Sequence, residues 1–122
     1  MKKIEAVIRW ERYEEVRAAL EAVGYPGMMV TEIQGHGVQR GVEVRNGKEY
    51  KIGLIRKLKL EIVCRDAAVP EIAHAIAESA RTGNVGDGKI FISPVEEVMR
   101  IRSGETGEDA LEAPVEAIAA TR

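Results

Sequence analysis

The period of the hydrophobic positions changes several times along this chain, and each change marks a new element. Apolar and polar residues alternate over residues 2–9, 28–34 and 58–63, and a period of two predicts strands. Apolar residues recur at helical spacing over residues 11–23, where Gly24 ends the helix, and over residues 69–80. A last strand is predicted to begin at Lys89.

The order β-α-β, long loop, β-α-β predicts an α+β fold, a ferredoxin-like βαββαβ sandwich with a long loop between strands 2 and 3. Two helices would cover one face of an antiparallel sheet. The other face would carry some of residues 4–8, 30–33 and 58–62, and we expect self-association to bury it. The domain spans residues 1–112, and residues 113–122 form a C-terminal extension. We expect a frayed helix over residues 106–122, which are rich in Ala and Glu and contain Pro114.

A glycine-rich stretch with cations beside it, residues 82–91 (TGNVGDGKIF), predicts a polyphosphate site. Gly83, Gly86 and Gly88 allow sharp turns that point backbone N–H groups inward, and Lys89 adds a point charge. Arg100 and Arg102 alternate on a segment that we expect to be extended, so both would project from one face. Clusters of Gly, Asn and Asp also form ordinary turns, and these residues alone leave that alternative open.

The same stretch matches G-x-x-x-x-G-K from Gly83 to Lys89, but it is not a phosphate-loop ATPase motif. Ile90 stands where that motif needs a Ser or Thr to hold magnesium, and a strand pattern follows where a helix is required.

Composition narrows the function classes. The chain has 122 residues, which is enough for one domain. Its formal net charge of −2 and its few aromatic residues do not indicate a surface that binds nucleic acid. The single Cys64 excludes an internal disulfide. The first residues, Met1-Lys2-Lys3-Ile4-Glu5, hold no apolar stretch of the kind found in signal peptides or membrane spans, so we expect a cytoplasmic protein without membrane insertion.

A series of short segments in fixed order resembles the P-II signal-transduction (nitrogen regulatory) protein family over about the first 110 residues. The matching segments are residues 1–9, 27–28, 30–32, 35–41, 49–50, 57–63, 80–83, 86–91, 94–97, 100–102 and 104–110. The resemblance implies a homotrimer of ferredoxin-like subunits that binds ATP or ADP in three clefts between neighbours.

The resemblance also implies which residues hold the nucleotide. Lys89 and the loop at Gly86 would meet the phosphates from one subunit, and Arg100 and Arg102 from the adjacent one. Gly27 and Met28 of that neighbour, with Val7, Glu61, Ile62 and Val63 of the first subunit, match positions around adenine and ribose. The full expected set is Val7, Gly27, Met28, Met29, Gly35, His36, Gly37, Val38, Gln39, Glu61, Ile62, Val63, Gly86, Asp87, Gly88, Lys89, Arg100 and Arg102.

A second ligand, 2-oxoglutarate, is implied by four further matches. Gln39 stands where the family has a glutamine that binds Mg²⁺ shared with ATP, and an amide oxygen is a suitable hard ligand for that ion. Lys57 matches the lysine that pairs with the distal carboxylate, and Arg9 and Gly86 lie where they could assist. The alternative is that these are solvated polar residues of a loop.

Residues 37–56 match the family's effector loop, which contacts a target protein, and the stretch is too long for an ordinary connection. Tyr50 aligns with a tyrosine that is nucleotidylylated in many bacterial members, although a loop aromatic also serves as an interface anchor. Asn46 stands where members that bind ammonium channels have arginine. Val38, Met29 and residues 53–56 also depart from the usual pattern.

Three hypotheses follow. The first is a binding protein, not an enzyme: a trimeric sensor of ATP or ADP and of 2-oxoglutarate with Mg²⁺ that regulates proteins of nitrogen and carbon metabolism through its loop. The second is a divergent paralogue that senses another metabolite and controls a different transporter or enzyme. The third is a weak ATPase in which Asp87 orients a water. His36, Cys64 and His74 are scattered and do not predict a metal site.

Overall fold

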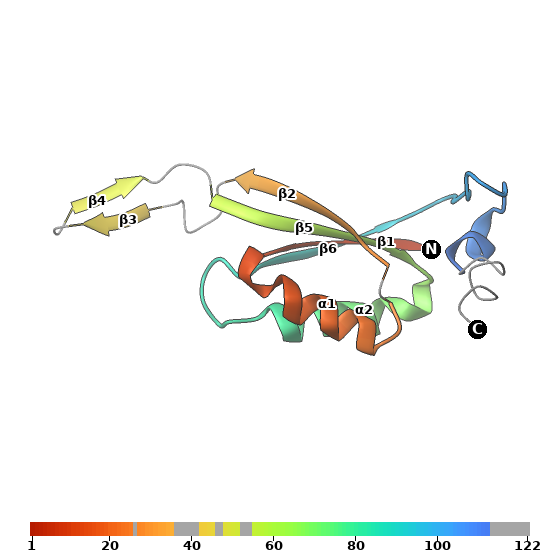
Figure 1. The fold of residues 1–122 in the computed structure, drawn as a ribbon, viewed down its shortest axis with the longest axis horizontal. Helices are drawn as coiled ribbons and strands as arrows, with labels where there is room; N and C mark the ends of the chain where they lie inside the picture. Colours follow the sequence, from red (N-terminus) through yellow and green to blue (C-terminus); the bar gives the residue numbers. More distant parts are fainter. Residues whose placement is uncertain (26, 36–41, 46–47, 52–54, 113–122) are drawn as a thin grey trace.

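The computed structural model describes residues 1–25, 27–35, 42–45, 48–51 and 55–112. Two helices lie on one face of a four-stranded antiparallel sheet, and a separate two-stranded hairpin lies beyond the ends of β2 and β5 (Figure 1). This is the predicted ferredoxin-like α+β arrangement. The elements are β1 (Lys2–Ile8), η1 (Trp10–Arg12), α1 (Tyr13–Ala22), β2 (Met29–Gly35), β3 (Val42–Arg45), β4 (Lys48–Lys51), β5 (Ile55–Cys64), η2 (Asp66–Ala68), α2 (Val69–Ala80), β6 (Gly88–Pro94) and η3 (Gly107–Leu111).

The sheet has the order β2-β5-β1-β6, so β1 is paired along both edges. Lys2 lies opposite Cys64 of β5 and Pro94 of β6, and Ile8 lies opposite Leu58 and Gly88. Because side chains alternate along a strand, one face of this sheet is buried against the helices. The core on that face comprises Ile4, Ala6, Ile8, Val16, Leu20, Leu60, Ile62, Cys64, Ile72 and Ile76.

The helix-free face of the sheet carries a group of charged side chains. Of the stretches from which some residues were expected on this face, Ile4 and Ile62 are buried in the core under the helices. The helix-free face carries Lys3 and Glu5, whose charged atoms lie 2.8 Å apart. Glu61 completes the group, with oxygens 3.5 Å from the amines of Lys3 and Lys59. Like-charged Glu5 and Glu61 are cross-strand partners in this face, so the flanking lysines compensate their repulsion.

An arginine links the two helices. Arg12, which immediately precedes α1, donates from Nε and Nη2 to the carbonyl of Ser79, at 3.0 and 2.6 Å. The carbonyls of the last turn of α2 have no partner within the helix, and the cation satisfies one of them. The start of α1 is thereby tied to the end of α2, next to the glycine-rich loop.

The expected loop of residues 37–56 contains regular structure in its described part. β3 and β4 pair antiparallel, with Val42 opposite Lys51 and Arg45 opposite Lys48, and β5 begins at Ile55, three residues before the predicted start. The sequence did hold a signal, because Asn46-Gly47 is the dipeptide most typical of a two-residue hairpin turn.

Two expectations about the C-terminal part also need correction. Residues 101–103 form a turn, so Arg102 does not lie on an extended segment with Arg100. The described part of the expected terminal helix is a short 3-10 helix, η3, and the remainder lies outside the described residues.

Gly88 allows the closest approach between β6 and β1. Its φ is +107°, and a Cβ placed on it would lie 1.7 Å from the carbonyl oxygen of Val7. A side chain there is excluded both by backbone conformation and by contact with main chain that cannot move without opening the sheet.

We expect Gly88→Ala to destabilise the fold by roughly 2–4 kcal/mol more than Gly24→Ala in chemical denaturation. Gly24 is the matched control because its φ is +88° and a Cβ on it would contact nothing within 4 Å. Both variants bear the left-handed strain of about 1–2 kcal/mol, and only Gly88→Ala adds the clash. Equal destabilisation would show that β6 does not approach β1 this closely.

Candidate functional site

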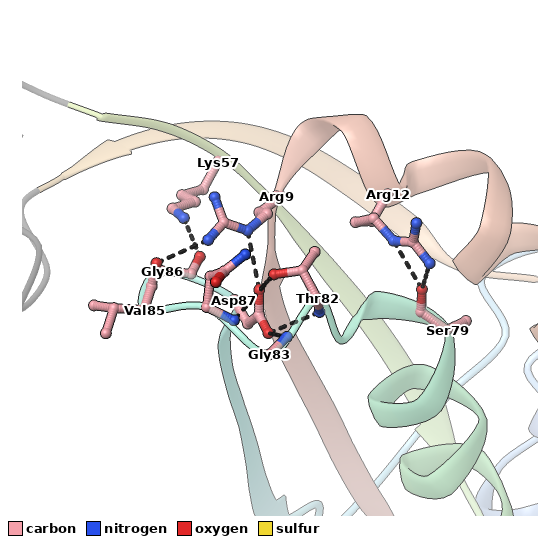
Figure 2. A network of polar contacts seen from close by, with 10 residues as sticks. Arg9, Arg12, Lys57, Ser79, Thr82, Gly83, Val85, Gly86 and Asp87 are labelled. Carbon is pink, nitrogen blue, oxygen red and sulfur yellow. Dashed lines mark hydrogen bonds and ion pairs between the residues drawn. The ribbon is translucent and has the colours of Figure 1, made fainter.

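The glycine-rich loop between α2 and β6 is organised by one carboxylate, that of Asp87 (Figure 2). Its Oδ2 accepts from the backbone N–H groups of Thr82 and Gly83, each at 2.8 Å. Its Oδ1 accepts from the Thr82 hydroxyl and from Arg9 Nε, the latter at 3.0 Å. These hydrogen bonds, with that of the Thr82 hydroxyl first, hold the pKa of Asp87 well below its usual range.

Asp87 therefore shapes the loop. Four donors already share its two oxygens, so it is a poor candidate for a base that orients an attacking water. The placement of Asp87 in a nucleotide site stays a prediction, and its contacts in this chain are with the loop itself and with Arg9.

Two cations from neighbouring strands contact the outer turn of the same loop. Arg9, which follows β1, donates from Nη2 to the carbonyl of Val85 at 2.8 Å, and Lys57 of β5 donates from Nζ to the carbonyl of Gly86. Burial and then the nearby Arg9 charge lower the pKa of Lys57. Two cations so close together repel each other, and an anion between them would relieve that repulsion.

The glycine-rich loop has left-handed backbone at two of its glycines next to a cavity. Gly86 and Gly88 have φ values of +102° and +107°, which is the left-handed backbone that the glycines were expected to supply. A cavity of about 270 Å³ lies beside the loop. Its lining includes Val7, Asp87, Gly88 and Lys89. Gly88 and Lys89 therefore line one cavity of a single chain, and phosphate binding there stays a prediction.

A second group of expected residues lies around another cavity, of about 680 Å³. Gly27, Ile62 and Val63 line it together, along with Leu111 and Glu112 from the C-terminal end. The resemblance implied that Gly27 of one subunit meets Ile62 and Val63 of another around the nucleotide, and that contact between subunits stays a prediction. The chain itself brings the three together because β5 and the segment before β2 are neighbours.

Arg100 lies in the C-terminal part and is held firmly. Its backbone N–H donates to Glu105 O at 2.8 Å, and its guanidinium contacts the Glu105 carboxylate. The same guanidinium donates to Ala110 O at 3.3 Å and to Glu112 O. Hydrogen bonding by the Ser103 hydroxyl, and then by Arg100, lowers the pKa of Glu105.

The two groups lie at opposite ends of the sheet (Figure 1). Gly88 pairs with Ile8 at one end of β1, and Cys64 pairs with Lys2 at the other, six positions away. Arg65, which follows Cys64, contacts Glu112, the residue that Arg100 also contacts. At about 3.4 Å per strand residue the separation is roughly 20 Å. Lys89 and Arg100 of one chain therefore cannot meet the same phosphate.

The remaining expected residues are distributed as follows. Met29 is 57% exposed on β2, and Gly35 ends that strand opposite Ile55. Tyr50 pairs with Glu43 across the β3–β4 hairpin. Residues 36–39, which include Gln39, lie outside the described residues. Within the described residues no group of His, Cys, Asp and Glu side chains could hold a metal ion, and no helix is long and apolar enough to cross a membrane.

Several contacts could not be predicted from the sequence. Thr82 was included only as the first residue of the predicted polyphosphate stretch, although Thr82-x-x-x-x-Asp87 is a spacing at which a hydroxyl and a carboxylate can close a loop. Arg65, Glu105 and Glu112 carried no signal, because isolated charges on polar segments are ordinary surface residues.

We expect Asp87→Asn to lower the free energy of unfolding at pH 7 and to flatten its dependence on pH at the acid end. An amide offers one acceptor oxygen, and its NH₂ group would face existing donors. Because the folded-state pKa of Asp87 lies below the ordinary value of 3.8, its stabilisation is present above pH 3.8 and is lost as pH falls through the folded-state value. Denaturation measured at intervals from pH 7 down to pH 2 covers both effects.

The exposed Asp109 in η3 gives the control variant Asp109→Asn. If Asp87→Asn and Asp109→Asn follow the same profile as the unchanged protein, Asp87 does not organise the loop.

Comparison with known proteins agrees with this architecture. The family model described as Nitrogen regulatory protein P-II matches residues 1–105. Nitrogen regulatory protein P-II 2 of Methanothermobacter thermautotrophicus is 53% identical over 112 residues, which cover 91% of this chain and 97% of that protein. The nitrogen regulatory proteins P-II of Cereibacter sphaeroides and Azospirillum brasilense are each 49% identical over 112 residues, covering 91% of this chain and 100% of theirs.

These are regulatory proteins of a signal-transduction family, not enzymes, as the first hypothesis expected. The chain belongs to the P-II nitrogen regulatory protein family.

Proposed function

We propose that this protein is a homotrimer that binds ATP or ADP in clefts between neighbouring subunits. The observation that carries the proposal is the separation of the two groups of site residues within one chain. The loop with Lys89 lies at one end of the sheet, and Gly27, Ile62, Val63 and Arg100 are associated with the other end. A second copy supplies the missing half.

The phosphates would lie against the loop of residues 83–88. Gly86 and Gly88 supply its left-handed backbone, and cations on the carbonyls of Val85 and Gly86 fix the turn in place. Lys89 of one subunit and Arg100 and Arg102 of the neighbour would complete a cationic shell. Charge-assisted hydrogen bonds of this kind contribute roughly 1.5–3 kcal/mol each.

We further propose that 2-oxoglutarate binds next to the nucleotide with Mg²⁺. Arg9 and Lys57 form a pair of neighbouring cations whose mutual repulsion favours a carboxylate between them. Gln39 would supply an oxygen to Mg²⁺, which would chelate the keto acid and the phosphates. When bound, the ion would join the two ligands, while the residues of this chain orient them.

The readout would be the segment of residues 37–56, which contains the β3–β4 hairpin and leads directly into β5. Lys57 is the third residue of β5, so a ligand on Lys57 would act at the base of this segment. Targets would be proteins of nitrogen and carbon metabolism, met in the cytoplasm. A paralogue with another second ligand is favoured instead by the departures at Val38, Asn46 and residues 53–56. The weak ATPase is not favoured, because the Asp87 oxygens are occupied.

Mixing variants tests the shared cleft. Lys89→Ala and Arg102→Ala should each weaken ATP binding by about tenfold to a hundredfold, the loss of one charge-assisted contact. A denatured and refolded equal mixture of the two should recover sites of wild-type affinity in calorimetry, because some clefts would pair an intact Lys89 with an intact Arg102.

The separately refolded variants are the controls. A mixture that shows only weak sites would mean that both cations act from the same chain or that they do not act at all.

Titration with ATP and Mg²⁺, and then with ADP, with and without 2-oxoglutarate, tests the second ligand. We expect 2-oxoglutarate to raise the affinity for ATP by about fivefold or more and to leave the affinity for ADP unchanged. Coupling between two binding sites is reciprocal and typically of this size. Lys57→Ala should remove the effect of 2-oxoglutarate while ATP still binds.

ATP binding that ignores 2-oxoglutarate in the unchanged protein would instead support the paralogue with a different second ligand.

A further inference from the structure

The end of the described chain forms a compact turn that is clamped to the body of the protein. We refer to residues 107–112, which include η3, as the C-terminal turn. Arg65, just beyond β5, lies 3.8 Å from a carboxylate oxygen of Glu108 through Nε, and its Nη2 contacts the carboxylate of Glu112. One arginine thus engages two acidic residues of the turn at once.

The C-terminal turn also engages Arg100. Both terminal nitrogens of this guanidinium have partners: Nη1 contacts the Glu105 carboxylate, and Nη2 donates to Ala110 O and Glu112 O. Two of the three acceptors are therefore backbone carbonyls of the turn. The side chain is only 15% exposed, so Arg100 does not sample solvent freely in this arrangement.

The same turn contributes to the wall of the larger cavity. Leu111 and Glu112 line it together with Gly27, Ile62 and Val63. The turn therefore contacts both a cavity lined by residues expected around the base and a cation expected to receive phosphate.

We propose that the C-terminal turn and the polyphosphate of a nucleotide are alternative partners of Arg100, which makes the turn an autoinhibitory element that Arg65 holds in place. The inference rests on the proposed nucleotide site. A guanidinium binds phosphate through bidentate hydrogen bonds from two of its nitrogens. Here Nη2 of Arg100 already donates to carbonyls of the turn. Phosphate is a stronger acceptor than a neutral carbonyl, so binding displaces the turn but has to overcome its attachment.

Weakening the clamp should therefore tighten nucleotide binding. In calorimetric titration with ATP and Mg²⁺ we expect Arg65→Gln to bind roughly two- to tenfold more tightly than the unchanged protein, which corresponds to one net hydrogen bond of competition removed. Arg17→Gln is the matched control: Arg17 also pairs with two glutamates, Glu14 and Glu21, but on α1.

A charge swap separates contact from charge. Arg65→Glu combined with Glu112→Arg keeps an ion pair between the two positions, although Glu108 loses its cation, and should bring the affinity back toward that of the unchanged protein. Binding by the swapped protein as tight as that of Arg65→Gln would mean that this ion pair does not hold the turn, which would overturn the proposal.

Hydrogen exchange of the unchanged protein supplies a test that needs no variant. Saturating ATP should speed exchange of the amide of Glu112, which donates to Asp109 O, because the turn leaves Arg100. Slower exchange there would mean that the turn closes on the ligand, and the proposal would be wrong.

The outcomes distinguish this inference from the proposed function. If the unchanged protein binds no nucleotide, the proposed function fails and this inference fails with it. If the unchanged protein binds nucleotide but Arg65→Gln binds it no more tightly, this inference alone fails.

Discussion

Strand β1 is paired with a neighbour along both of its edges, and the placement of the candidate site depends on that double pairing. Its seven residues are in register with β5 on one side and with β6 on the other. The alternation within β1 buries Ile4, Ala6 and Ile8 at no more than 2% exposure and turns Lys3, Glu5 and Val7 to the other face. Because β6 lies against β1 without space for a side chain at Gly88, the loop before β6 is fixed relative to Arg9 at the end of β1.

That fixed geometry explains why cations donate to backbone carbonyls at the end of the sheet where the glycine-rich loop lies. Arg9 reaches both Asp87 and Val85, and Lys57 reaches Gly86, so residues from β1, β5 and the α2–β6 loop form one polar network (Figure 2). At the other end of the sheet, Arg65 and Arg100 hold acidic side chains and carbonyls of the C-terminal turn in a comparable way. Each end of the sheet therefore has cations already engaged by acceptors of the same chain, and an anionic ligand at either end would have to exchange with them.

The sequence predicted the elements that have strong periodicity. Residues 69–80 were assigned as a helix, and α2 has those bounds; the last strand was placed at Lys89, and β6 begins one residue earlier. The β3–β4 hairpin was missed, although Asn46-Gly47 signals it, because two four-residue strands give too few alternations to stand out from a polar loop. The turn at residues 101–103 was missed because Arg-Ile-Arg alternates like a strand, whereas hydrogen bonds from Arg100 to the nearby Glu105 close the chain into a turn. In the candidate site, the sequence indicated the turn glycines Gly86 and Gly88 and the cation Lys89 beside them. The roles of Asp87, Arg65 and Glu105 depend on which distant groups the fold brings to them, and no local pattern encodes that.

The helix-free face carries Lys3, Glu5, Lys59 and Glu61 close together, with side chains between 18% and 33% exposed. A charge that is buried without its partner destabilises a complex by several kcal/mol, whereas a paired one is roughly neutral. Any surface that covers this face must therefore leave each of the four charges with a partner of opposite sign. The face consequently discriminates among the chains that could lie against it: a sheet with the same order of charges is accepted, and one with a single sign out of place is rejected.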